Sequence, residues 1–224
     1  GVLINRGTIT NENGPALATE LVASDSLLHT IPAQKVQLTD TVSYEGLERG
    51  VSYEIKGRLV RQATGEALLD SQGNEIVVTK TFTASLSTGS IDMSFELDAT
   101  DLSGQSIVAY ETLYRDGQPV AEHEDLNDEN QTVSVPQIAT KASVAGKKVS
   151  ASTGEATIDD LVTCSNLVPG EHYQLHAYLV DAESGDMVLE NEEAVTATQD
   201  FVAEAPNETH QMGLSLNGAN VSGK

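Results

Sequence analysis

The segment DTVSYEGLERGVSYEIKGRLV, residues 40–60, decides the fold because the chain contains it twice. Residues 160–180, DLVTCSNLVPGEHYQLHAYLV, repeat it at an offset of 120. Both copies begin with aspartate, reach a glycine at the same position and end in Leu-Val. Self-similarity at a fixed offset indicates two copies of one structural unit. The sequence therefore predicts two tandem domains with the same fold.

Apolar and polar residues alternate in and around this segment, for example in KVQLTDTVSY (35–44), EIVVTKTFTA (75–84) and SIVAYETLY (106–114). A period of two is typical of β-strands with one buried face, and glycine-containing turns separate the runs. The pattern predicts an all-β protein with an immunoglobulin-like β-sandwich in each copy. Helix should be scarce, and GPALATELVAS (14–24) is the one stretch that we expect to form a short helical turn or an ordered loop.

The repeat places the first domain at residues 1–135 and the second at 137–224, with a short linker around Pro136. The second copy ends without a counterpart of residues 106–135, which should supply the final strands of the first copy. We therefore expect an open sheet edge in the second domain, onto which a C-terminal strand from another molecule could dock. The termini do not resemble a signal peptide, which suggests an excised fragment.

The chain of 224 residues carries 12 lysine and arginine residues against 34 aspartate and glutamate residues, a net charge of −22. This charge argues against partners such as nucleic acid or an anionic membrane surface. No apolar run is long enough to span a bilayer. A single cysteine, Cys164, excludes an internal disulfide and a multi-cysteine metal site. We expect no cofactor and no bound metal.

Several polar residues fall on the apolar face of the predicted strands. Asp40 shares a face with Leu38 and Val42. Its repeat partner Asp160 shares a face with Ile158 and Val162. Glu111 falls among the inward positions of 106–114, and Gln131 shares its face with the valines of QTVSV. A buried amide or carboxyl without partners is costly, by about 1 to 3 kcal/mol for an amide. The pattern indicates either a satisfied polar network or a reactive site.

The segments VAYETLY (108–114) and VAEHEDLNDENQTV (120–133), preceded by residues 40–59, resemble the repeated immunoglobulin-like domains of Gram-positive surface adhesins that form an internal Thr-Gln ester bond. The resemblance covers residues 1–135 and continues through 137–224. It implies a structural stalk module of an extracellular, cell-wall-anchored protein, next to other repeats and to domains that bind a host ligand. It implies no enzyme, only one self-directed acyl transfer per domain.

By this resemblance, Gln131 is the acyl donor, His123 the assisting base and Asp40 the first assisting acid. Glu111 is the second acid on parity, with Asp98 as the rival. The resemblance implies a threonine on the first strand as nucleophile. We assign it to Thr8 in RGTIT, with Thr10 left open because TIT departs from the usual Thr-x-Ala pattern. Threonine should attack the Gln131 carbonyl and release ammonia, so Gln131 points inward as a reactant.

Three other functions are compatible with parts of the sequence. The first is a sandwich adhesin module that binds a host ligand without a cross-link. The second is a Lys-Asn isopeptide bond through Lys141 in the second copy. The third is a hydrolase with a Thr-His-Asp triad, which no nucleophile-elbow motif supports. The oxygen-rich segment DLNDEN (125–130) lacks the glycine and terminal glutamate of a calcium loop, so we expect a solvated turn there.

Overall fold

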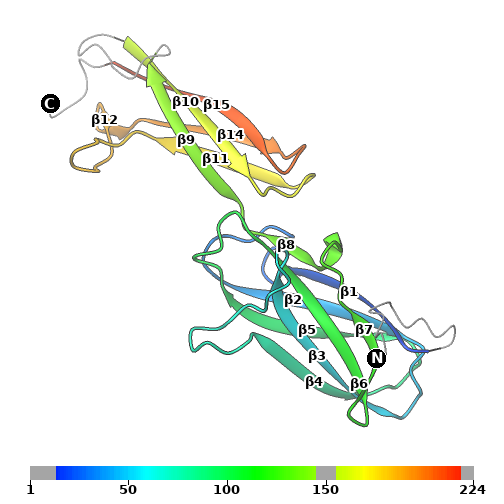
Figure 1. Cartoon of the computed structure of the whole chain (residues 1–224). Helices are drawn as coiled ribbons and strands as arrows, with labels where there is room; N and C mark the ends of the chain where they lie inside the picture. The colour runs from blue at the N-terminus through cyan, green and yellow to red at the C-terminus, as the bar shows by residue number, and fades with distance from the viewer. Residues whose placement is uncertain (1–13, 145–154, 218–224) are drawn as a thin grey trace, which may run out of the picture. The chain divides into compact units, whose positions relative to one another are not determined.

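The computed structural model describes residues 14–144 and 155–217, and the chain divides into two units, Gly1–Pro136 and Gln137–Lys224. Figure 1 shows that both units consist almost entirely of strands. The prediction of an all-β protein with two tandem β-sandwich domains is confirmed. In the described ranges, no helix is both long and apolar enough to cross a membrane.

The first unit contains two antiparallel sheets. One has the order β1-β2-β5, and the other has the order β4-β3-β6-β7, with β8 also paired to β6 (Figure 1). The first sheet consists of β1 (Ala16–Ala23), β2 (Lys35–Glu45) and β5 (Gly89–Asp98). The second consists of β3 (Ser52–Arg61), β4 (Val77–Thr83), β6 (Ser106–Arg115), β7 (Gln118–His123) and β8 (Thr132–Ser134).

The core of the first unit lies between the two sheets, and buried residues alternate with exposed ones most clearly along β2, β3 and β5. Leu38 and Val42 of β2, Phe95 of β5, Leu59 of β3 and Leu113 of β6 belong to one buried apolar cluster. The alternation read from the sequence thus matches the pleat of the strands, since neighbouring side chains leave a strand on opposite faces. The apolar cluster holds the two sheets together.

The segment GPALATELVAS differs from its prediction, because residues 16–23 form strand β1 and no helical turn. β1 pairs antiparallel with β2 along its whole length, with Thr19 opposite Val42 and Leu21 opposite Asp40. Its local spacing of apolar residues is ambiguous between helix and strand, and pairing with the adjacent β2 decides in favour of the strand. Among the described residues, β1 is one of the two edge strands of its sheet, and β5 is the other.

A tight turn and a β-bulge together set the register between β6 and β7. Asp116 and Gly117 both have positive φ, 51° and 74°, as a two-residue hairpin turn of type I′ requires. The turn pairs Arg115 with Gln118 and Tyr114 with Pro119, and a bulge then shifts the register by one residue, so that His123 of β7 lies opposite Glu111 of β6. The hairpin thereby places a titratable residue of one strand beside a carboxyl of the next.

The second unit has smaller sheets. β10 (Glu155–Ser165) lies between β9 (Gln137–Val144) and β15 (Glu208–Asn217). Two further sheets pair β11 (His172–Tyr178) with β14 (Thr196–Val202) and β12 (Leu189–Glu190) with β13 (Glu193–Ala194). The order β9-β10-β15 repeats the order β1-β2-β5 of the first unit. Its buried apolar cluster includes Val162, Leu175 and Met212.

Candidate functional site

Four polar side chains meet inside the first unit. Asp40, Glu111 and Gln131 are each 0% exposed, and Thr19 is 8% exposed. Asp40 comes from β2 and Thr19 from the neighbouring β1, while Glu111 comes from β6 of the facing sheet. Gln131 ends a short 3-10 helix, η1 (Glu129–Gln131), that lies against both β1 and β6. The expectation that Asp40, Glu111 and Gln131 point inward is confirmed.

The hydrogen bonds inside this cluster are incomplete. The amide Nε2 of Gln131 donates to Oε2 of Glu111 at 2.5 Å. The other polar atoms have no hydrogen bond of normal geometry: Thr19 Oγ1, both carboxyl oxygens of Asp40, Glu111 Oε1 and Gln131 Oε1. Nearly all buried polar atoms in folded proteins are hydrogen-bonded, so this concentration of unpaired atoms requires an explanation. A site built for a reaction between its own side chains provides one.

Burial changes the protonation of the two carboxyl groups. Burial raises the pKa of Asp40 to about 6, although Glu111 and the electrostatic effect of the nearby His123 oppose the rise. The pKa of Glu111 is raised well above its usual value, first by burial and second by the charge of Asp40. Two carboxyl groups in one dry site cannot both ionise easily. The neutral form of one of them is therefore favoured, and a neutral carboxyl can donate a hydrogen bond.

His123 lies at the rim of the cluster, with its side chain 25% exposed. Its Nε2 is 2.8 Å from Oδ2 of Asp128. When Nε2–H donates to this carboxylate, Nδ1 carries the lone pair and can accept a proton. Asp128 thus holds the imidazole in one tautomer and one orientation, as the acid of a catalytic triad does. Asp128 was not among the residues selected from the sequence, because its contact with His123 depends on how the loop folds.

Asp128 also organises the turn that carries Gln131. It caps η1, where its Oδ1 accepts from the backbone N of Asn130 at 2.9 Å. Its backbone carbonyl accepts from the N of Gln131 at 3.2 Å and from the hydroxyl of Thr132 at 2.7 Å. Capping of this kind fixes the first turn of a helix. One residue therefore positions both His123 and Gln131.

The nucleophile predicted from the sequence lies outside the described residues, since both Thr8 and Thr10 precede residue 14. Within the described part of the chain, Thr19 is the threonine at the site. The repeat contains a signal for it that the sequence reasoning missed: PALAT (15–19) matches PQIAT (136–140). The strand register supports this match. Thr19 lies opposite Val42, and Thr140 lies opposite Val162, which is the counterpart of Val42 in the repeat.

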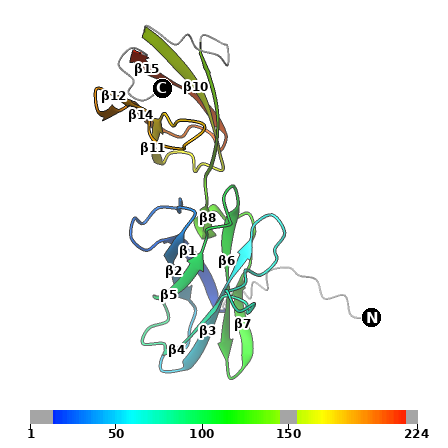
Figure 2. The same ribbon diagram turned by 90° about the vertical axis from the view of Figure 1, so that its left-hand side faces the viewer.

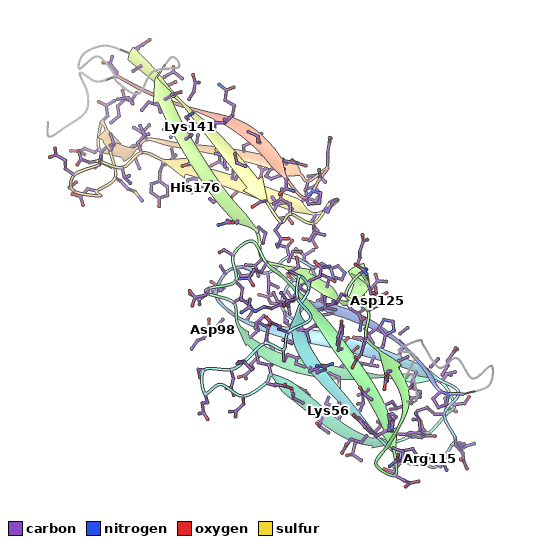
Figure 3. All side chains as sticks on the ribbon, in the orientation of Figure 1. Lys56, Asp98, Arg115, Asp125, Lys141 and His176 are labelled. Carbon is purple, nitrogen blue, oxygen red and sulfur yellow. The ribbon has the colours of Figure 1, made fainter. Side chains whose placement is uncertain are left out.

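Asp98, the rival for the second acid, lies apart from this cluster. It is the last residue of β5 and is exposed, and Figure 3 shows it at the surface of the first unit. Its Oδ1 accepts from the hydroxyl of Thr100 at 2.6 Å, and hydrogen bonds with Thr100 lower its pKa. An ionised surface carboxylate bound to its own turn is a capping group, whereas Glu111 contacts Gln131 directly.

No group of three potential metal ligands occurs among residues 14–144 and 155–217. The segment DLNDEN forms a turn in which Asp125 accepts from the backbone N of Asn127 at 2.9 Å. Asp125 lies at the surface in Figure 3, and Asp128 is bound to His123. Asp125 therefore hydrogen-bonds within the turn, and Asp128 binds the imidazole of His123.

The second unit contains part of the same arrangement. Asp160 of β10 is buried, with an unpaired Oδ1, and pairs in register with Ala142 of β9. Thr140, the counterpart of Thr19, is exposed on β9. At an offset of about 120, counterparts of Glu111, His123 and Gln131 would fall beyond residue 224. Within residues 14–144 and 155–217, the complete set of these residues occurs in the first unit.

A family model matches each of the two units. The model of a family described as the T-Q ester bond containing domain matches residues 15–135 and again residues 136–224. Two solved structures of an adhesin from Mobiluncus mulieris, described as containing intramolecular disulfide, isopeptide and ester bond cross-links, are also similar to the chain. They show 15% and 13% identity with TM-scores of 0.49 and 0.47. They cover 85% and 88% of this chain, and 99% and 98% of their own.

No match was found among curated proteins. The two family matches together span almost the whole chain, and both begin just before strands in equivalent positions, β1 and β9. The first match contains the buried cluster of Asp40, Glu111 and Gln131 in full. The chain belongs to the family of T-Q ester bond containing domains, of which it comprises two copies.

Proposed function

We propose that the first unit forms an intramolecular ester bond between the hydroxyl of Thr19 and the side-chain carbonyl of Gln131. Thr19 Oγ1 attacks Cδ of Gln131, the amide nitrogen leaves as ammonia, and the carbonyl oxygen is retained in the ester. The observation that carries this proposal is the set of unpaired buried polar atoms on Thr19, Asp40, Glu111 and Gln131. They are the atoms that such a reaction requires.

The surrounding residues supply the proton transfers. His123, oriented by Asp128 at 2.8 Å, takes the hydroxyl proton and later delivers a proton to the leaving nitrogen. The neutral carboxyl of the Asp40 and Glu111 pair donates a hydrogen bond to the oxygen that becomes negative in the tetrahedral intermediate. The fold supplies proximity, which can lower a barrier by roughly 7 to 11 kcal/mol.

Intact mass tests this proposal, since ester formation removes about 17 Da as ammonia. The unmodified chain should show this loss, and Thr19→Ala and Gln131→Ala should each show their full calculated mass. Thr8→Ala and Thr140→Ala serve as matched controls and should retain the loss. Full mass in the folded, unmutated chain would refute the ester, and a persisting loss in Thr19→Ala would give the nucleophile to another residue.

The ester gives the chain a structural role rather than an enzymatic one, because the first unit reacts once with itself. We infer a stalk module of a surface-displayed adhesin, cross-linked against force, heat and proteases and anchored to the cell wall. Membership of the T-Q family supports this role, and the charge of −22 suits a surface exposed to water. Its neighbours would be further repeats, with host ligands bound by other domains.

The second unit offers a related reaction between molecules. Thr140 and Asp160 occupy the positions of Thr19 and Asp40, and β11 pairs on one side only within the described residues. A strand equivalent to residues 106–135 could pair with that edge and present its glutamine to Thr140. Such a segment would become covalently attached by the same loss of ammonia.

A further inference from the structure

The strand that pairs with the edge of β6 is interrupted at the site. β7 pairs with β6 up to His123 opposite Glu111, and β8 resumes with Thr132 opposite Val108. Along β6 the two pairs are three residues apart, from Glu111 to Val108. Along the pairing strand, β7 and then β8, they are nine residues apart, from His123 to Thr132. The partner therefore carries six residues more than a continuous strand would need. We call residues 124–131, which contain this excess, the inserted loop.

The inserted loop is fixed to the outer face of the sheet through Leu126. Val60 of β3 and Val108 of β6 are both 0% exposed, although their neighbours Leu59 and Ile107 are the residues that point into the main core. With Tyr110 they form a separate apolar cluster, and Leu126 packs against it. The loop thus buries apolar surface on a face that is otherwise polar.

Polar contacts tie the same loop to β3 and to the turn that follows it. Gln62 Nε2 donates to the backbone oxygen of Leu126 at 3.1 Å. Arg58 Nη2 is 3.2 Å from Oε1 of Glu124, and its guanidinium lies 5.3 Å from the centre of the Tyr110 ring. An exposed ion pair contributes little, so packing of Leu126 is the main contribution. Leu126 lies two residues before Asp128 and five before Gln131.

We propose that Leu126 is a positioning residue for ester formation and for the retention of the ester. Its packing on Val60, Val108 and Tyr110 holds the inserted loop down, so that Asp128 reaches His123 and Gln131 reaches the buried carboxyl pair. The same packing keeps water from the ester, which His123 could otherwise activate for hydrolysis. This inference rests on the proposed function, because it concerns the same reaction.

The test separates the three mass states of the chain. Ester formation removes about 17 Da, and hydrolysis of the ester then adds about 18 Da, which leaves a glutamate one dalton heavier than the original glutamine. The chain is made by cell-free synthesis, and intact masses are recorded over time at a fixed pH. Circular dichroism under the same conditions shows whether each variant is folded.

Leu126→Ala should form the ester about 10 to 100 times more slowly, the range expected from misplacing reacting groups. It should also accumulate the hydrolysed species. Leu126→Met keeps the apolar contact and should restore both rates to within about twofold of the unmutated chain. Leu86→Ala is the matched control, because Leu86 is an exposed leucine of the same unit and packs on no part of the site.

Unchanged formation and no hydrolysis in folded Leu126→Ala would overturn the proposal, while an ester in the unmutated chain would leave the proposed function intact. No ester in the unmutated chain would overturn both. If Leu126→Ala does not fold, Leu126→Val decides, because a smaller loss of packing should give a smaller but measurable slowing. A rate for Leu126→Val equal to that of Leu126→Met would then count against the proposal.

Discussion

Asp40 and Glu111 share one dry site, and their carboxyl groups oppose each other's ionisation. A buried carboxylate costs free energy unless it is paired, and the described residues offer these two groups only one another, His123 and the polar atoms of Thr19 and Gln131. The proposed ester reaction would use a neutral acid at this position, and strongly raised pKa values are typical of reactive sites.

The raised pKa of Asp40 predicts the sign of the pH dependence of stability. In Thr19→Ala, which cannot form the ester, the folded state binds more protons than the unfolded state between pH 3.8 and about 6. The free energy of unfolding should therefore fall as pH rises through this range, by about 3 kcal/mol from Asp40. Glu111 adds a fall of the same sign.

Urea unfolding at several pH values between about 4 and 7.5 measures this dependence. Asp40→Asn in the Thr19→Ala background should flatten the curve, and comparison of the two curves cancels the contributions of exposed acids. A stability that rises with pH and is unaffected by Asp40→Asn would contradict the assignment of a raised pKa to Asp40.

Strands β2, β3 and β6 determine where the reactive groups meet. β3 brings Gly57 directly opposite Glu111 of β6, and the absence of a side chain at Gly57 leaves room for the core residues Phe95 and Met93 of the facing sheet. An ideal Cβ on Gly57 would lie 2.8 Å from Cζ of Phe95 and 3.0 Å from Cε of Met93. The glycine thus allows the two sheets to approach next to the site.

Gly57→Ala should therefore disturb both packing and chemistry. Overpacking of a core typically costs about 1 to 3 kcal/mol, and the shift of β3 against β6 should move Glu111 and slow ester formation. Gly213→Ala is the control, since its Cβ would meet only Thr157 Cγ2 at an ordinary 3.8 Å. Chemical denaturation and intact mass measure the two effects. Equal stability and equal ester rates in both alanine variants would show that the space at Gly57 is unimportant.

At the scale of the molecule, the proposed ester joins β1 near the start of the first unit to the turn before β8 near its end. Both views show β8 beside β1, and these elements contact each other (Figures 1 and 2). The bond would close a loop of 113 residues, counting both ends, from 19 to 131. By analogy with a disulfide, closing a loop of this length stabilises the folded state by about 4 to 5 kcal/mol.

The two units should therefore respond differently to the loss of the bond. Thr19→Ala should lower the melting temperature of the first unit by roughly 10 to 20 °C, and it should leave the transition of the second unit unchanged. Differential scanning calorimetry resolves the two transitions, and Thr140→Ala provides the control in the equivalent strand. Similar transitions in Thr19→Ala and Thr140→Ala would mean that no stabilising bond starts at Thr19.

The sequence by itself determined the repeat, the all-β class and the inward orientation of Asp40, Glu111 and Gln131. The class and the orientations follow from local patterns, since the period of two within a strand determines which side chains share a face. The same reasoning considered both Asp98 and Glu111 as the second acid. It favoured Glu111, which the structure places next to Gln131.

Only the tertiary structure decided the rest. β1 has a burial pattern that is irregular toward its end, and its identity as a strand depends on pairing with β2. Thr19 was consequently identified from the pairing register of β1 with β2, and not from the period of apolar residues. The contact of Asp128 with His123 and the packing of Leu126 depend on a loop that breaks the edge strand. Contacts between distant segments are set by packing and strand pairing, which no local pattern of residues encodes.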